Sequence, residues 1–433
     1  MIYLRRNNRS NRNRRNFINT DDTKKLTTGL VKLVIILSVV FLVVVIFNIT
    51  KNWINYKKIV DMANQEINNS ISNNYENTSS DTNSNKELSD TTFTLTALGD
   101  IMCHNTQYLD AYNSSTDSYN FSYVFDDISY YIQNSNISIA NLETSFAGES
   151  KGYSNYPRFN TPDNLAYNLK KLGLDIIATA NSHSLDYGFD GLSRTLDVLD
   201  KADISHVGTN KTQEEQDNVL IKYVKGIKLA FVNYTCNTTN LAIPSDKEFC
   251  INTSNKDLIK KQIDKAKSQN ADIIIAYMNW GDEYTANVNT TQTELSDFLF
   301  KNGVDIILGS HPHVLQKIEK KTITLEDGSS KDGFIIYSLG NFISDQNLKD
   351  TRTSIILTLT ITKHTNGNIS IDKVNYVPIY MYENNALSDK KMKLLDINKT
   401  VSLYKQGIDT SIGDNMFNFL TSELNRIPEI LYY

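Results

Sequence analysis

The chain has 433 residues, 40% of them hydrophobic, and a formal net charge of −5 at pH 7. This hydrophobic share excludes a wholly disordered chain and permits one large core with a smaller module. The first 32 residues carry nine Lys or Arg and two Asp, a net charge of +7, so the remainder carries −12. Such an acidic remainder gives no reason to expect a nucleic-acid partner.

The N-terminal region combines a basic segment with a long apolar run. Residues 1–29 are rich in Arg, and the run LVKLVIILSVVFLVVVIFNI at residues 30–49 contains one charge, Lys32. This length predicts one transmembrane helix. The positive-inside rule then places the N-terminus in the cytoplasm beside anionic membrane lipids, and everything after about residue 50 outside the cell membrane. A cleaved signal peptide is the alternative, but no small-x-small site follows the run.

Residues 50–91 are rich in Asn, Ser, Thr and charge, with few apolar positions. A segment of this composition buries too little surface to offset the entropy of ordering, so it predicts a flexible linker. Beyond it lie the three cysteines of the chain. Cys236 and Cys250 are near enough in sequence to form a disulfide in an exported domain, and partly buried free thiols are the alternative.

From residue 92 the pattern alternates between strands and helices, which predicts an α/β domain over 92–365. Gly or Asn ends three of the four helical patterns. The predicted strands are 93–99, 137–141, 175–180, 229–234, 272–278, 305–310 and 334–342, and the predicted helices are 164–173, 189–203, 255–270 and 291–303.

The end of the chain has a different pattern. The runs 354–362 and 369–379 flank HTNGN, which predicts an antiparallel pair around a tight turn. Residues 384–433 carry mixed helical patterns without obvious chemistry. We therefore expect 366–433 to be an accessory C-terminal region.

Five apolar runs end abruptly in side chains that can bind a metal ion. Parallel strands bring their carboxyl ends to one crevice, so these side chains are expected to lie together. Asp, Glu, Asn and His gathered there could hold one or two divalent ions. The residues are Asp100, His104, Glu143, Asn181, His183, Asn279, Glu283, His311 and His313.

The motifs differ in how specific they are. Asp100 follows Gly99 directly after a strand, which suits a metal ligand as well as a helix N-cap. In GSHPHV, Pro312 separates His311 and His313, and two imidazoles so fixed favour metal binding.

A histidine and a carboxylate also stand close together in ANSHSLDYG. Asp186 can orient His183 as an acid or electrostatic stabiliser, and a purely structural His–Asp pair is the alternative.

These motifs carry a resemblance to a known family. GDIMCH, NLET, YPRFNTPDNL, ANSHSLDYGFDGL, NWGDEY, GSHPHVLQ and YSLGNF occur in this order between about Phe93 and Thr362. The chain resembles the bacterial poly-gamma-glutamate capsule biosynthesis family (CapA-type), which is related to calcineurin-like metallophosphatases. The resemblance implies a metallophosphatase-like four-layer α/β/β/α sandwich with a dinuclear metal centre at the strand ends.

The resemblance also implies roles for single residues. Metal ligands are expected at Asp100, Glu143, Asn181, His311 and His313, with His104 as a further candidate, and His183 with Asp186 matches the family's His–Asp pair. The metal could be Mn, Zn, Fe or Mg. At Asn279 the family usually has His, which implies a weakened second metal site. Either Glu283 compensates there, or the protein binds a single ion.

The function implied is that of a membrane-anchored, extracytoplasmic protein of capsule assembly. It would handle poly-gamma-glutamate or a related anionic polymer, with capsule synthase or export subunits as possible partners. An exported metallophosphatase or phosphodiesterase is the second hypothesis. A non-catalytic polymer-binding module is the third, and Asn279 is its main argument.

Overall fold

The computed structural model describes residues 89–432, apart from 239–240, 325–327, 329 and 388. The predicted basic segment 1–29, the predicted transmembrane helix 30–49 and almost all of the predicted linker 50–91 lie outside the described residues. Among the residues that are described, no helix is both long and apolar enough to cross a membrane.

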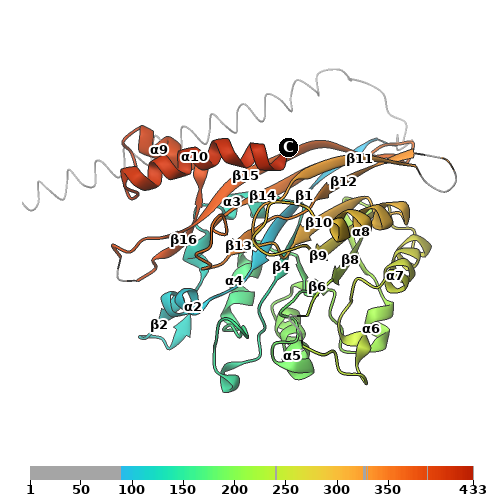
Figure 1. Ribbon diagram of the computed structural model, residues 1–433, viewed down its shortest axis with the longest axis horizontal. Helices are drawn as coiled ribbons and strands as arrows, with labels where there is room; N and C mark the ends of the chain where they lie inside the picture. The colour runs from blue at the N-terminus through green and yellow to red at the C-terminus, as the bar shows by residue number, and fades with distance from the viewer. Residues whose placement is uncertain (1–88, 239–240, 325–327, 329, 388, 433) are drawn as a thin grey trace, which may run out of the picture. The chain divides into compact units, whose positions relative to one another are not determined.

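The larger of two main sheets has eight strands, and it is mixed (Figure 1). Its centre is parallel and its C-terminal side is antiparallel, because β1 pairs in parallel with β4 and β13 and antiparallel with β14. In spatial order its strands are β16 (Met392–Asp396), β15 (Ile369–Glu383), β14 (Thr353–Lys363), β1 (Thr91–Ile101), β4 (Ile137–Leu142), β5 (Ile176–Ala178) and β6 (Ser205–Val207), with β13 (Asn341–Ile343) beside β1.

The second sheet has six strands, with antiparallel hairpins at both edges and parallel strands between them. In spatial order these are β11 (Ile318–Thr324), β12 (Ser330–Ile336), β10 (Ile306–Ser310), β9 (Ile273–Asn279), β8 (Ile227–Thr235) and β7 (Leu220–Val224). A separate two-stranded ribbon pairs β2 (Tyr112–Asn113) with β3 (Ser118–Tyr119).

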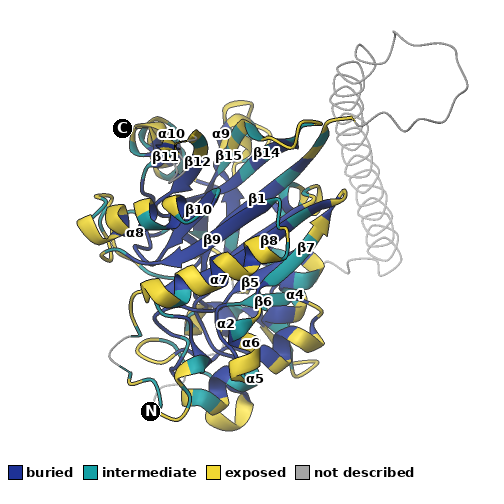
Figure 2. Ribbon diagram, turned by 90° about the vertical axis from the view of Figure 1, so that its right-hand side faces the viewer, coloured by how far each residue is buried: buried dark blue, intermediate teal, exposed yellow. Residues whose placement is uncertain are grey.

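The two sheets pack face to face, and helices cover their outer faces. Alternate residues of β1, such as Phe93 and Leu95, share one core with Phe231 of β8 and Ile275 of β9. On the outer faces, a second core lies under α4 (Asn164–Leu172) and α5 (Gly188–Lys201) and a third under α7 (Lys256–Ser268) and α8 (Thr290–Lys301). Figure 2 shows central strands such as β1 and β9 as buried and these helices as exposed on their outer sides. The predicted α/β/β/α order of layers is therefore confirmed.

All four predicted helices are present in the structure. These correspond to α4 (Asn164–Leu172), α5 (Gly188–Lys201), α7 (Lys256–Ser268) and α8 (Thr290–Lys301). The sequence prediction did not include α2 (Asn105–Ala111), α3 (Ser129–Gln133) and α6 (Gln213–Asp217). All three are short, so they show too few apolar repeats to stand out from a loop.

Residues 366–433 share the core of the domain. β15 and β16 extend the eight-stranded sheet, and the predicted turn at HTNGN joins β14 to β15. α9 (Ile397–Lys405) and α10 (Asp414–Leu431) contribute Val401, Leu420 and Ile427 to the core that also lies between the sheets. The described residues all belong to one compact unit.

Two glycines allow close approach of backbone at the carboxyl ends of the strands. A Cβ at Gly99 would lie 1.8 Å from the carbonyl oxygen of Gly340, and one at Gly309 would lie 1.9 Å from that of Tyr337. The predicted strand 334–342 is therefore divided: β12 joins the six-stranded sheet, the turn before Asn341 crosses over, and β13 joins the eight-stranded sheet. This crossover brings the strand ends of both sheets to one place.

Candidate metal centre

The site forms where strands of both sheets end. Asp100 near the end of β1 lies in register with Asn141 of β4 on one side and Asn341 of β13 on the other. Glu143 follows β4 directly, and His311 follows β10 directly. Side chains from segments far apart in sequence therefore come together at the ends of the strands.

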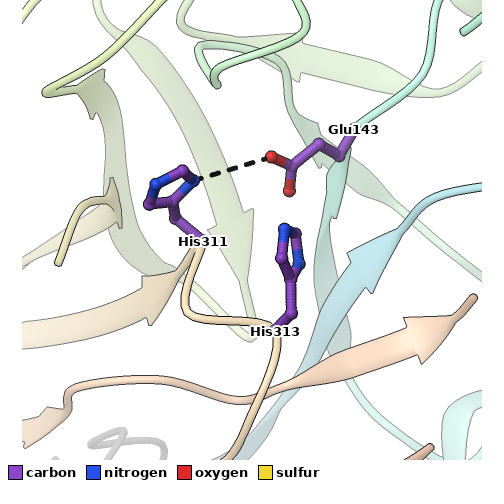
Figure 3. Close-up of side chains that lie close together, drawn as sticks. All are labelled: Glu143, His311 and His313. Carbon is purple, nitrogen blue, oxygen red and sulfur yellow. Dashed lines mark ion pairs between the residues drawn. The ribbon is translucent and has the colours of Figure 1, made fainter. Parts of the chain in front are cut away.

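Glu143, His311 and His313 form a buried cluster. Each offers one possible ligand atom, and these atoms all lie within 4.8 Å of one another. Figure 3 shows both imidazoles rising from the loop after β10 toward the Glu143 carboxylate. His311 Nδ1 lies 3.9 Å from Glu143 Oε1. This is the spacing of atoms that could share one ion, since ligand bonds to such ions are about 2.0–2.2 Å long.

His311 carries the clearest sign of a missing partner. Its Nδ1 atom is buried and has no hydrogen-bond partner among the described residues. Its backbone φ is 92°, and that of His313 is 59°, a region that residues other than Gly adopt at a cost of about 1–3 kcal/mol each. Such outliers gather at functional sites, so the loop conformation and the unpartnered nitrogen both point to a ligand here.

Asp100 anchors the second histidine. Its Oδ2 atom lies 3.2 Å from His313 Nδ1 and also accepts a hydrogen bond of 3.3 Å from the His311 backbone N–H. Asn341 Oδ1 lies 3.1 Å from the same nitrogen of His313. Because Nδ1 faces these two oxygens, Nε2 is the nitrogen left for an ion. An imidazole held through its other nitrogen is typical of metal sites.

Two residues that the sequence analysis did not single out hold the carboxylates. The Asn141 side chain donates to Asp100 Oδ1 at 2.8 Å and to Glu143 Oε2 at 3.0 Å. The Ser182 hydroxyl donates to Glu143 Oε1 at 2.8 Å. Asn141 and Glu143 stand two positions apart at the end of a strand, so the two-residue period could have placed both on one face.

The buried charges shift one another's pKa values. Burial and the nearby charge of Glu143 raise the pKa of Asp100. The pKa of Glu143 is lowered, because its interaction with His311 and the charges of His313 and His183 outweigh the effect of burial. Burial likewise opposes the charged form of His313, but its hydrogen bond to Asp100 and the two carboxylate charges raise its pKa to about 9.

The predicted His183–Asp186 pair is formed beside this cluster. His183 Nδ1 lies 2.9 Å from Asp186 Oδ2, and both side chains are buried. Although burial opposes it, the bond to Asp186 raises the pKa of His183. The Phe159 backbone N–H donates to Asp186 Oδ2 at 2.6 Å, and the Phe159 ring meets the His183 ring edge-on, with centroids 4.8 Å apart. This pair is therefore held in one orientation.

Of three other predicted ligands, two use their amide oxygens elsewhere and the third is exposed. Asn181 Oδ1 accepts from the His183 backbone N–H at 3.0 Å. Asn279 is buried, and its Oδ1 accepts from the Thr235 hydroxyl at 2.9 Å. Glu283 is exposed in the loop after β9. For all three, a role as ligand stays a prediction.

His104 also lies at the edge of the site. It is half-buried at the start of α2, and its Nδ1 lies 3.0 Å from the Met102 carbonyl oxygen and 3.1 Å from the Asp345 backbone N–H. Its ring meets Phe159 edge-on. Burial lowers the pKa of His104. These contacts occupy Nδ1, and a ligand role stays a prediction for this residue too.

The cysteines take no part in the site. Cys103 and Cys250 are buried, Cys236 is exposed, and all three are free thiols. Of the two alternatives that the sequence leaves open, the structure has free thiols and no bond between Cys236 and Cys250.

The donor set fits a divalent metal ion. Two carboxylates and two imidazoles, from Asp100, Glu143, His311 and His313, are fully or almost fully buried, and Nδ1 of His311 has no hydrogen-bond partner in the part of the chain that the structure describes. Mixed oxygen and nitrogen ligands suit Zn, Mn and Fe better than Mg, which prefers oxygen alone.

Comparison with known proteins identifies the family. A family model described as bacterial capsule synthesis protein PGA_cap matches residues 94–346, more than half of the chain. The chain belongs to this family. Similar members are the capsule biosynthesis protein CapA of Bacillus anthracis, 30% identical over 275 residues, and the PGA biosynthesis protein CapA of Bacillus subtilis strain 168, 29% identical over 217 residues. The aligned parts cover 61% and 48% of this chain, and 62% and 52% of the two relatives.

Two solved structures overlap with part of this chain at low sequence identity. The calcineurin-like phosphoesterase YfkN from Bacillus subtilis overlaps 77% of this chain and 99% of its own, with 14% identity and a TM-score of 0.41. A putative 5'-nucleotidase from Staphylococcus aureus overlaps 70% of this chain and 57% of its own, with 15% identity and a TM-score of 0.45. The fold assignment here therefore rests on the strand pairing and the layered cores.

Proposed function

We propose that this PGA_cap family member is a membrane-anchored, extracytoplasmic protein of the bacterial cell membrane that depends on a divalent metal. It acts in the synthesis, export or processing of poly-gamma-glutamate or a related anionic envelope polymer. Family membership supports the polymer role. The basic residues 1–29 and the apolar run 30–49 support a single-pass anchor with a cytoplasmic N-terminus.

The observation that carries the metal dependence is the buried Nδ1 of His311 beside Glu143, which has no hydrogen-bond partner from any described residue. Leaving a polar atom buried without a partner costs about 1–3 kcal/mol. A divalent ion held by Glu143, His311 and His313, with Asp100 as a further carboxylate, would satisfy this nitrogen. When bound, such an ion supplies Lewis-acid polarisation of a carbonyl or phosphoryl group.

The side chains of the site have separate tasks in this proposal. Asn141 and Ser182 hold the Glu143 carboxylate in place, and Asp100 with Asn341 fixes the ring of His313. Asp186 holds His183 through Nδ1, which leaves Nε2 of His183 to donate a proton to a leaving group. The raised pKa of His183 favours the protonated form that this task needs.

The polymer role is tested by complementation of a deletion strain, with the surface polymer measured. Wild type is expected to restore the polymer, and His311→Ala to fail at equal protein level. Asn375→Ala, an exposed change on β15, serves as the matched control and should restore it fully. An unchanged polymer yield in the deletion strain would refute the proposal. Complementation by both Asp100→Ala and His313→Ala would favour a non-catalytic polymer-binding module.

A second candidate is an exported metallophosphatase or phosphodiesterase. The buried carboxylates and imidazoles beside a His–Asp pair favour it, because this chemistry also suits phosphoryl groups. Purified full-length protein should then hydrolyse a model phosphodiester with Mn²⁺ or Zn²⁺, and His183→Gln should lower the turnover. No turnover with any divalent metal in a folded preparation would exclude this candidate.

A further inference from the structure

Arg158 differs from every other arginine that the structure describes. The described part of the chain contains four arginines, and three of them form ion pairs with carboxylates. The pairs are Arg194 with Asp163, Arg352 with Asp345, and Arg426 with Glu423. The exposed guanidinium of Arg158 pairs with no described carboxylate. It is therefore free to bind an anionic group from outside the chain.

The backbone around Arg158 is tied to the His183–Asp186 pair. Ser154 Oγ donates to the Arg158 carbonyl at 2.7 Å and lies 2.8 Å from the Tyr187 hydroxyl. The next residue, Phe159, donates its backbone N–H to Asp186 and packs its buried ring against His183. The point from which the Arg158 side chain extends is therefore fixed close to the proposed proton donor.

A cavity of about 390 Å³ lies at the same place. It has one cationic lining residue, Arg158, and one acidic residue, Asp186, whose side chain is already bonded to His183 and Phe159. Most of the remaining wall is apolar. It is formed mainly by Leu185, Tyr187, Leu241, Ala242 and Pro244.

We propose that this cavity is a substrate-binding subsite in which Arg158 binds a carboxylate of the polymer. The inference rests on the proposed polymer function. In a γ-linked glutamate chain each residue keeps one free α-carboxylate, which matches the planar fork of a guanidinium, and its methylene groups match the apolar wall. Because residues 33–433 carry a net charge of −12, a polyanion needs such a local cation near the site.

The test is binding of a fluorescently labelled γ-linked glutamate hexamer to the purified full-length protein. Arg158→Gln should weaken binding by about 10- to 100-fold, the range expected for charge-assisted hydrogen bonds. Arg158→Lys should recover part of the loss, since it keeps the charge without the fork. Lys373→Gln removes one exposed positive charge on β15 and should change affinity by less than about twofold. The melting temperature of each variant checks that it is folded.

The outcomes separate the two proposals. If wild type binds the hexamer and Arg158→Gln binds it as well as Lys373→Gln does, the subsite is refuted and the polymer function stands. If wild type does not bind the hexamer, both proposals fail. A hexamer with methyl-esterified carboxylates should bind weakly and show no dependence on Arg158. Tighter, Arg158-dependent binding of a glycerol-phosphate oligomer would overturn the carboxylate assignment in favour of phosphate.

Discussion

His311 Nδ1 lies 3.9 Å from Glu143 Oε1, is buried, and has no hydrogen-bond partner among the described residues. Glu143 does not satisfy this nitrogen, because the distance between the two atoms is too long for a hydrogen bond. Their separation suits two ligands of one ion, and His313 completes the cluster. We therefore infer that Glu143, His311 and His313 hold a metal ion.

Asn141 should matter for metal affinity although it is not a ligand in the proposal. It donates to both Asp100 and Glu143, so Asn141→Ala leaves two buried carboxylates without their shared donor. Loss of such a supporting contact typically weakens metal binding by about 10- to 100-fold. Calorimetric titration with Mn²⁺ measures this, with Asn375→Ala as the exposed control. Equal affinities for the two variants would show that Asn141 has no supporting role.

Metal binding should strengthen as the pH rises. The pKa of His313 is raised to about 9 in the metal-free protein, so at neutral pH the ring carries a proton that ligation must remove. For one released proton, affinity rises about tenfold for each pH unit below 9 and levels off above it. Titrations with Zn²⁺ between about pH 6 and 8 measure the slope. Affinity that is independent of pH in this range would contradict the proposed role of His313.

Asp186 should set the protonation of His183. The bond to Asp186 raises the pKa of His183 against the effect of burial, so Asp186→Asn should lower that pKa. Histidine-labelled protein followed by NMR across pH measures it, and His183→Gln identifies the resonance among the six histidines. His206, which pairs with Asp200, is the internal control and should titrate as before. A His183 titration unchanged by Asp186→Asn would remove the argument for a proton donor.

The crossover that assembles the site should be sensitive to a single methyl group. In Gly99→Ala the new Cβ would lie 1.8 Å from the Gly340 carbonyl oxygen, so the backbone of β1 must move. We expect a loss of about 2 kcal/mol or more in the free energy of unfolding, and a weaker metal site. Gly413 has no atom within 4 Å of an added Cβ, and Gly413→Ala should cost less than about 1 kcal/mol. Equal melting curves for the two variants would contradict this account.

The sequence predicts the site well where a residue directly follows a buried strand. Glu143 and His311 stand at such points, Asp100 is the second-last residue of β1, and hydrophobic runs with sharp ends reveal all three. The sequence analysis does not predict a role for Asn141, because this residue lies inside the apolar strand β4 and not after its end. Asn141 supports the site by its contact with Asp100 in the neighbouring strand. The local pattern of apolar residues does not show which strands pair with each other.

The sequence also could not predict the direction in which each polar side chain of the site points. Asn181 turns its amide oxygen to a backbone N–H two residues on, a local contact that short polar side chains often make in turns. Asn279 bonds to Thr235 on a neighbouring strand, and Glu283 faces solvent from a loop. All three lie at or shortly after the end of a β-strand, so only the three-dimensional contacts separate them from the cluster of Glu143, His311 and His313.

The most direct test is the metal content of purified full-length protein, measured for wild type and His311→Ala after exposure to Mn²⁺, Zn²⁺ or Fe²⁺. The variant keeps the other cluster residues and loses the imidazole whose Nδ1 has no hydrogen-bond partner among the described residues. We predict at least one tightly held ion per wild-type chain and a large loss in His311→Ala. Wild-type protein that is folded but holds none of these metals, or a variant that retains wild-type metal content, would contradict the claim.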